Sequence, residues 1–163
     1  VSIATSKDTA DFVCDSITSW WLTQGRADYP LATSILALAD SGGSNSYRHY
    51  VFKEALQRLA DELGIEIRMA HYPPYASKWN PVEHRVFPFI TKALKGAILT
   101  SHEQVRNLIA RAKTSTGLKV TAQLVKKVYH TGKKVATGFK ESMRILFDKT
   151  LGQWNYRAVP LQN

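Results

Sequence analysis

The feature that most constrains the fold is an unbroken apolar segment at residues 35–39, with the sequence ILALA. It ends at Asp40 and is followed by SGGSN, a composition typical of a tight turn. A strand that does not alternate between apolar and polar residues is typical of a strand covered on both faces. We therefore expect a central strand over residues 34–40, with Asp40 at its carboxyl end.

Strand and helix patterns alternate along most of the chain. Such an order predicts an α/β fold whose strands are parallel and joined by right-handed helical crossovers. The segment after residue 117 is expected to be a smaller, basic hairpin and helix packed on the same core, which divides the chain into residues 1–117 and 118–163. The expected strands are 1–5, 34–40, 65–69 and 118–129, and the expected helices are 8–23 (stopped by Gly25), 46–63 (closed by Gly64), 80–94, 101–113 and 138–147.

Size and composition are those of an ordinary globular chain with one core, since 163 residues carry 44% apolar and 21% charged side chains. No apolar run approaches the roughly 20 residues that a membrane span needs, and no secretory signal is visible. Cys14 has no second cysteine to pair with. These features fit a cytoplasmic protein, with Cys14 as a small packing residue.

The charge of the chain is +9 and is unevenly distributed. Residues 111–149 contain ten bases and two acids, whereas residues 1–45 contain five acids and two bases. Such asymmetry favours a polyanionic partner. The alternative is a solvated surface that only keeps the protein soluble.

Glu83 is the second acidic residue of interest. Asn80 is a favourable N-cap and Pro81 suits the first helical position, which puts Glu83 at the third. This spacing is equally that of a capping box, in which the carboxylate accepts from the Asn80 amide, and that of a metal ligand at a helix start. Two carboxylates, Asp40 at a strand end and Glu83 at a helix start, can meet at one edge of an α/β sheet and hold Mg²⁺.

Other polar residues near Glu83 are weaker candidates. Lys78 can neutralise a phosphate and His84 can contact one, although a residue in the first turn of a helix more often faces solvent. Trp79 is expected to be a core residue rather than a platform for base stacking. His71, at a strand end, has no evident partner in the sequence. The sequence has no set of Cys and His residues at the spacing of a zinc site, no phosphate-binding loop and no serine nucleophile elbow.

Two motifs carry a resemblance to a known family. Residues 38–45 (LADSGGSN) and 74–84 (PYASKWNPVEH) resemble the second and third acidic motifs of the DDE transposases of bacterial insertion sequences. The resemblance is strongest to the Rhodopirellula-type transposase DDE domain. The 42 residues between Asp40 and Glu83 are comparable to the interval in that family. The likeness extends over nearly the whole chain and includes residues 8–10, 116–120 and 154–156.

The resemblance implies a ribonuclease H-like mixed sheet flanked by helices, with two Mg²⁺ ions and DNA strand cleavage and transfer as the chemistry. Asp40 would be the second and Glu83 the third metal-binding carboxylate. The first would lie on a strand upstream of residues 1–5, and neither Asp8 nor any other residue matches it. We therefore expect a catalytic-core fragment that lacks its first two strands. Alone, it should bind metal weakly and be inactive.

The resemblance also implies DNA as the partner, both transposon ends and target, in the bacterial cytoplasm and on the nucleoid when DNA is bound. Multimers are common among transposases, so a homo-oligomer is an expected state. The side chains expected to contact DNA are Lys78, His84, Lys126, Lys127, Lys133 and Lys134.

Two other interpretations stay open on the sequence alone. One is a catalytically inactive, transposon-derived module that binds nucleic acid or supports assembly. The other is a different ribonuclease H-like nuclease, in which Glu103 or Glu141 would supply a further acid from a late helix.

Overall fold

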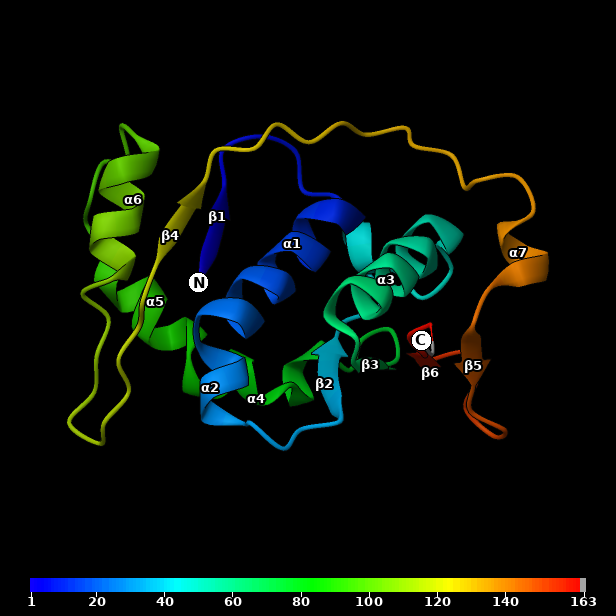
Figure 1. Cartoon of the computed structure of the whole chain (residues 1–163). Helices are drawn as coiled ribbons and strands as arrows, with labels where there is room; N and C mark the ends of the chain where they lie inside the picture. Colours follow the sequence, from blue (N-terminus) through cyan, green and yellow to red (C-terminus); the bar gives the residue numbers. More distant parts are fainter. Residues whose placement is uncertain (162–163) are drawn as a thin grey trace. The chain divides into compact units, whose positions relative to one another are not determined.

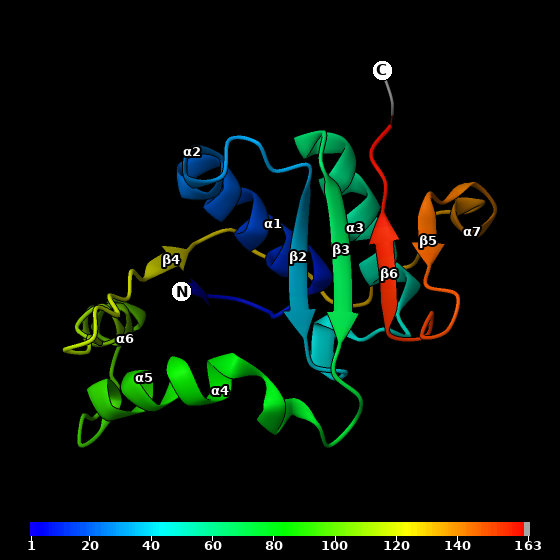
Figure 2. The ribbon, with the colours of Figure 1, turned by 90° about the horizontal axis from the view of Figure 1, so that it is seen from below.

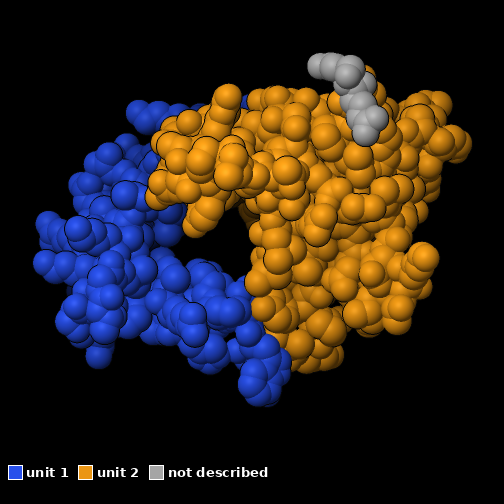
Figure 3. Space-filling view, turned by 60° about the horizontal axis from the view of Figure 1, so that its bottom comes forward, with its two compact units in different colours: residues 1–7, 78–129 blue, residues 8–77, 130–163 orange. Residues whose placement is uncertain are grey.

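The computed structural model describes residues 1–161. Within this range the chain forms two compact units, which are described separately below (Figure 3). Unit 1 comprises residues 1–7 and 78–129, and unit 2 comprises residues 8–77 and 130 onward. The boundaries between the units therefore follow residues 7, 77 and 129, and none of them coincides with the predicted boundary after residue 117. The division into residues 1–117 and an appendix over 118–163 packed on the same core stays a prediction.

Unit 2 is built on a mixed four-stranded sheet in the order β2-β3-β6-β5 (Figure 2). The first two strands, β2 (Ser34–Ala39) and β3 (Glu66–His71), are parallel, and Ala39 is opposite His71. They are joined through helix α3 (Tyr50–Leu63), as the alternation of patterns predicted. Strand β6 (Asn155–Ala158) is antiparallel to both β3 and β5 (Ile145–Phe147). The predicted mixed α/β class is confirmed.

Helix α1 (Ala10–Trp20) begins where the Thr9 hydroxyl accepts a hydrogen bond from the Phe12 amide. The prediction that Gly25 stops this helix is wrong, because the chain continues helically through Trp21–Gly25 into α2 (Arg26–Asp28). Gly25 has helical dihedrals, and a Cβ there would lie 2.8 Å from the Trp21 ring. Its role is therefore to leave room for a side chain rather than to end the helix.

The core of unit 2 lies between the sheet and helices α1 and α3, which cover the same face (Figures 1 and 2). Phe52, Leu56 and Ile67 are completely buried there. Cys14 is also buried, and desolvation raises the pKa of its thiol to about 12, which fits the packing role expected for it.

The opposite face of the sheet is not covered by these helices. Leu36 is 62% exposed and Leu38 is 48% exposed. The prediction of a central strand covered on both faces is therefore wrong for β2, which is an edge strand of this sheet. The reason is that the helices before and after β2 both pack on one side of it.

The carboxyl-terminal part of unit 2 also differs from prediction. The helix expected over residues 138–147 is a single turn, α7 (Phe139–Ser142), followed by strand β5. The backbone becomes extended at Met143, so Ile145 can join the sheet beside Ala158 of β6. The residues around Tyr156, for which the sequence pattern predicted no strand, form β6, an internal strand of the sheet.

Unit 1 contains a parallel pair of short strands, β1 (Ser2–Ala4) and β4 (Gln123–Val125). The strand predicted over residues 118–129 is thus much shorter, and β1 pairs with β4 rather than with β2. The helices of this unit are α4 (Pro81–Arg85), α5 (Phe87–Leu94) and α6 (His102–Ile109). Among the described residues, no helix has both the length and the apolar character needed to cross a membrane.

Candidate functional site

Asp40 is the first residue after β2, and its side chain is exposed. Its backbone is well anchored, because its carbonyl oxygen lies 3.0 Å from Nδ1 of His71. The following residue is anchored as well, since the Ser41 hydroxyl donates to the carbonyl of Tyr72. Among residues 1–161, no hydrogen bond or ion pair occupies the carboxylate. The site therefore presents a free carboxylate on a fixed peptide.

Glu83 lies in the first turn of α4 and is half-buried. Asn80 caps this helix, with its side-chain oxygen 3.3 Å from the amide of Val82. The amide of Glu83 donates to the carbonyl of Asn80, but in the described chain the carboxylate does not accept from the Asn80 amide. The reciprocal half of a capping box is thus missing, which leaves the carboxylate available as a ligand.

The neighbours of Glu83 take structural roles in unit 1. His84 donates from Nε2 to the carbonyl of Lys78 at 2.6 Å, which ties α4 to the preceding loop. The ammonium of Lys78 lies 5.4 Å from the centre of the Trp79 ring. The prediction that Trp79 is a core residue is wrong, because it is 71% exposed. DNA contacts by Lys78 and His84 stay predictions.

The four lysines proposed to contact DNA are divided between the two units. Lys126 and Lys127 follow β4 in unit 1, whereas Lys133 and Lys134 belong to unit 2. Lys133 is paired with Asp11, which also binds Arg58. Burial raises the pKa of Asp11, but the hydrogen bonds from both cations outweigh this and hold that pKa below its ordinary value. Lys133 is therefore partly neutralised.

Asp40 and Glu83 belong to different units. Within residues 1–161, no three His, Cys, Asp or Glu side chains form a group that could hold a metal ion. The donor chemistry nevertheless fits Mg²⁺, because both residues offer hard carboxylate oxygens that no other group among residues 1–161 engages. Their convergence on one ion stays a prediction.

Sequence reasoning missed a buried polar network beneath Asp40. His71 is only 5% exposed, and its Nε2 lies 2.8 Å from the hydroxyl of Tyr156. Burial lowers the pKa of His71, which favours the neutral imidazole. The signal was its position at the end of the alternation Ile67, Met69, His71, which places it on the buried face of β3.

Lys53 is the cation of this network. It is 4% exposed, donates to the carbonyl of Tyr47, and lies 4.8 Å from the centre of the Tyr156 ring. Desolvation lowers its pKa from 10.5 to about 8. The signal for its burial was its place one helical turn before Gln57 and two before Ala60, in a buried row of α3.

The lowered pKa of Lys53 predicts that the stability of the protein depends on pH in an unusual direction. Its pKa is depressed in the folded state, so between about pH 8 and 10.5 the unfolded chain binds more protons at this site. The free energy of unfolding should therefore rise with pH across that window, by about 1–2 kcal/mol after allowance for solvent screening. In Lys53→Met this contribution should vanish. Urea unfolding of the wild type and of Lys53→Met from about pH 7.5 to 9.5, roughly the lower half of the window, measures this contribution. Equal slopes of the unfolding free energy against pH in the two proteins would contradict the prediction.

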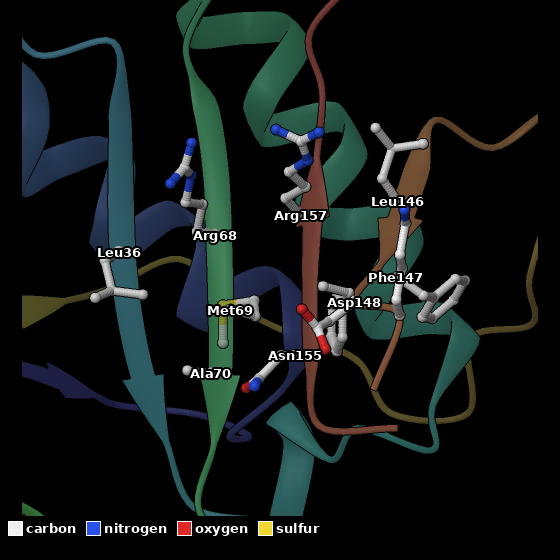
Figure 4. A pocket seen from close by; sticks show the side chains of 11 residues that line it. Leu36, Arg68, Met69, Ala70, Leu146, Phe147, Asp148, Asn155 and Arg157 are labelled. Atoms are coloured by element: carbon white, nitrogen blue, oxygen red, sulfur yellow. The ribbon is translucent and has the colours of Figure 1, made fainter. Parts of the chain in front are cut away.

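A pocket of about 600 Å³ lies on the uncovered face of the sheet (Figure 4). Three basic residues line it, and two of them, Arg68 and Arg157, pair with Glu66 at 2.5 Å and 3.0 Å, while the third is Lys149. Asp40 is not among the residues that line it. The pocket is therefore a feature separate from Asp40.

The mixed sheet and its helices define an α/β protein, a class in which ligands commonly bind at the carboxyl ends of parallel strands. The family model of the Rhodopirellula transposase DDE domain matches residues 1–160, so the chain belongs to this family of transposase domains. The resemblance seen in the two acidic motifs is thereby confirmed. Comparisons with curated proteins and with solved structures gave no match.

Proposed function

We propose that this chain supplies Asp40 and Glu83 to the Mg²⁺-dependent cleavage and transfer of DNA strands by a DDE transposase. The observation that carries the proposal is the free Asp40 carboxylate, held on a fixed peptide at the end of β2. Membership of the DDE family supports it. The fold proposed for the sheet and Glu83 together is ribonuclease H-like.

In the proposed reaction the two carboxylates bind the metal and orient it, and no residue of this chain forms a covalent bond to DNA. Asp40 and Glu83 would hold the metal through their oxygens. When bound, Mg²⁺ would activate water or a DNA 3′-hydroxyl and neutralise charge on the leaving oxygen. Basic side chains of residues 111–149 would hold backbone phosphates, an interaction that gives salt-dependent affinity with little sequence preference.

Metal binding by the full-length protein that the gene encodes tests the proposal. Mn²⁺ affinity should fall by at least about 100-fold in Asp40→Asn and in Glu83→Gln, because a directly coordinating oxygen should matter more than the outer-shell partners whose loss costs about 10–100-fold. Asp28→Asn, an exposed acid of α2, is the matched control and should bind like the wild type. Wild-type affinity in both site variants would overturn the proposal.

The salt dependence of DNA binding tests the proposed phosphate contacts. Each lost contact should lower the slope of log affinity against log salt by about 0.9 on duplex DNA. Lys126→Gln with Lys127→Gln should therefore lower it by up to about 1.8, and so should Lys133→Gln with Lys134→Gln.

The control for that experiment is Lys7→Gln with Arg26→Gln, which removes the same charge from the acidic amino-terminal region. Its slope should match that of the wild type. Slopes that change equally in the control and in the Lys126 and Lys127 variant would mean that net charge, and not a defined contact, sets the affinity.

A further inference from the structure

The side chain of His71 reaches one residue beyond the sheet. The last backbone hydrogen bond between β2 and β3 runs from the Tyr72 amide to the Ala39 carbonyl at 2.8 Å. The next carbonyl, that of Asp40, has no strand partner and instead lies 3.0 Å from Nδ1 of His71. The imidazole thus extends the ladder to the peptide that carries the proposed metal ligand.

The partners of His71 fix its tautomer. A backbone carbonyl can only accept a hydrogen bond, so Nδ1 must carry the proton that is donated to Asp40. In the neutral ring Nε2 then has a lone pair, and the Tyr156 hydroxyl at 2.8 Å donates to it. The opposite tautomer would place the Nδ1 lone pair against the Asp40 oxygen. The Asp40 carbonyl therefore selects this tautomer, and the Tyr156 hydroxyl provides the matching hydrogen bond to Nε2.

Tyr156 is itself held rigidly. It lies in β6 opposite Met69 of β3, and it is 4% exposed. Its ring stacks on His71, with the ring centres 5.5 Å apart, and the ammonium of Lys53 lies 4.8 Å from its centre. A hydroxyl on such a buried, packed ring has little freedom to turn away from Nε2.

We infer that His71 is a positioning residue, which, oriented by Tyr156, fixes the Asp40 peptide so that its carboxylate is presented for metal binding. The inference deepens the proposed function and rests on it. The same relation is familiar from outer-shell groups that orient metal ligands through hydrogen bonds. Packing alone does not require it, because an apolar ring would fill the space between Phe52 and Tyr156.

The first test uses the metal-free chain. NMR order parameters of the Asp40 and Ser41 amides should be about 0.85 in the wild type, and ¹⁵N shifts should show His71 protonated at Nδ1. His71→Phe keeps a ring but removes the donor, and the order parameters should fall below about 0.6. His71→Asn, whose amide nitrogen takes the place of Nδ1, should restore them.

Gln57→Met is the matched control. Gln57 is also buried in unit 2 and bonds two backbone groups, the Val159 carbonyl at 2.7 Å and the Arg144 amide at 2.9 Å. Gln57→Met should lower the stability of the fold about as much as His71→Phe does, but it should leave the order parameters of Asp40 unchanged. An Asp40 peptide as rigid in His71→Phe as in the wild type would overturn the inference, as would equal loosening by Gln57→Met.

The second test measures Mn²⁺ affinity of the full-length protein. His71→Phe should weaken binding about tenfold, while His71→Asn and Gln57→Met should stay within about threefold of the wild type. Equal affinities in His71→Phe and Gln57→Met would reduce His71 to a structural residue. If the wild type binds no Mn²⁺, the proposed function fails, and the order parameters alone decide whether His71 fixes Asp40.

Discussion

Replacing Asp40 by Asn should lower the rate of Mg²⁺-dependent DNA strand cleavage by at least about 10³-fold, since bound metal contributes several kcal/mol to stabilising the transition state. Glu83→Gln should have a similar effect. Both substitutions keep the size of the side chain and remove only its charge. Because Asp40 is exposed and its carboxylate has no hydrogen bond among residues 1–161, the fold should not depend on it.

Cleavage of transposon-end DNA by the full-length protein measures this effect, with thermal unfolding as the check on folding. Asp28→Asn should cleave at the wild-type rate and melt at the same temperature. Rates within a fewfold of wild type for Asp40→Asn would show that another group does the chemistry, and an equal loss in Asp28→Asn would point to net charge.

The largest effect on stability is expected at Phe52. Its side chain is completely buried beneath the sheet, and its ring meets that of His71 edge-on, with centres 6.2 Å apart. Phe52→Ala should therefore cost about 3–5 kcal/mol, through lost burial and the cavity left behind. This is a large share of the roughly 5–15 kcal/mol by which typical domains are stable.

Urea unfolding measures the loss, and Phe87→Ala provides the matched control. Phe87 begins α5, is 45% exposed and should cost less than about 1 kcal/mol when truncated. Similar losses at both positions would mean that the core of unit 2 is not organised around Phe52.

Local patterns predicted the elements around Asp40 well. The apolar run ending at Asp40 became β2, and the helical spacing before Gly64 became α3, which ends at Gly64 with a φ of 63°. The alternation at residues 65–69 became β3. In each case the decisive interactions lie within a few residues or within one strand–helix–strand unit, where a sequence pattern carries the information.

Long-range choices were predicted less well. Which face of β2 is exposed depends on the side of the sheet on which α1 and α3 pack. The residues of the strand itself do not specify that side. The pairing of β1 with β4 joins segments about 120 residues apart, and β6 enters the sheet from the end of the chain. Gly25 looked like a helix stop, but the packing of Trp21 on it is a tertiary contact.

The candidate site divides in the same way. Asp40 and Glu83 could be selected because each begins or ends a regular element. Spacing could not decide whether Glu83 caps its helix, and the geometry shows that in the described chain its carboxylate does not. His71 could be assigned to the buried face of β3, but its bond to the Asp40 carbonyl requires the parallel register of β2 and β3.

The most direct test is an experimental structure of the full-length protein bound to transposon-end DNA and Mn²⁺. We expect oxygens of both Asp40 and Glu83 about 2.1 Å from metal ions that lie about 3.5–4 Å apart beside the scissile phosphate. Metal ions held without Asp40, or a Glu83 carboxylate bound to other side chains and remote from the ions, would contradict the proposed active site.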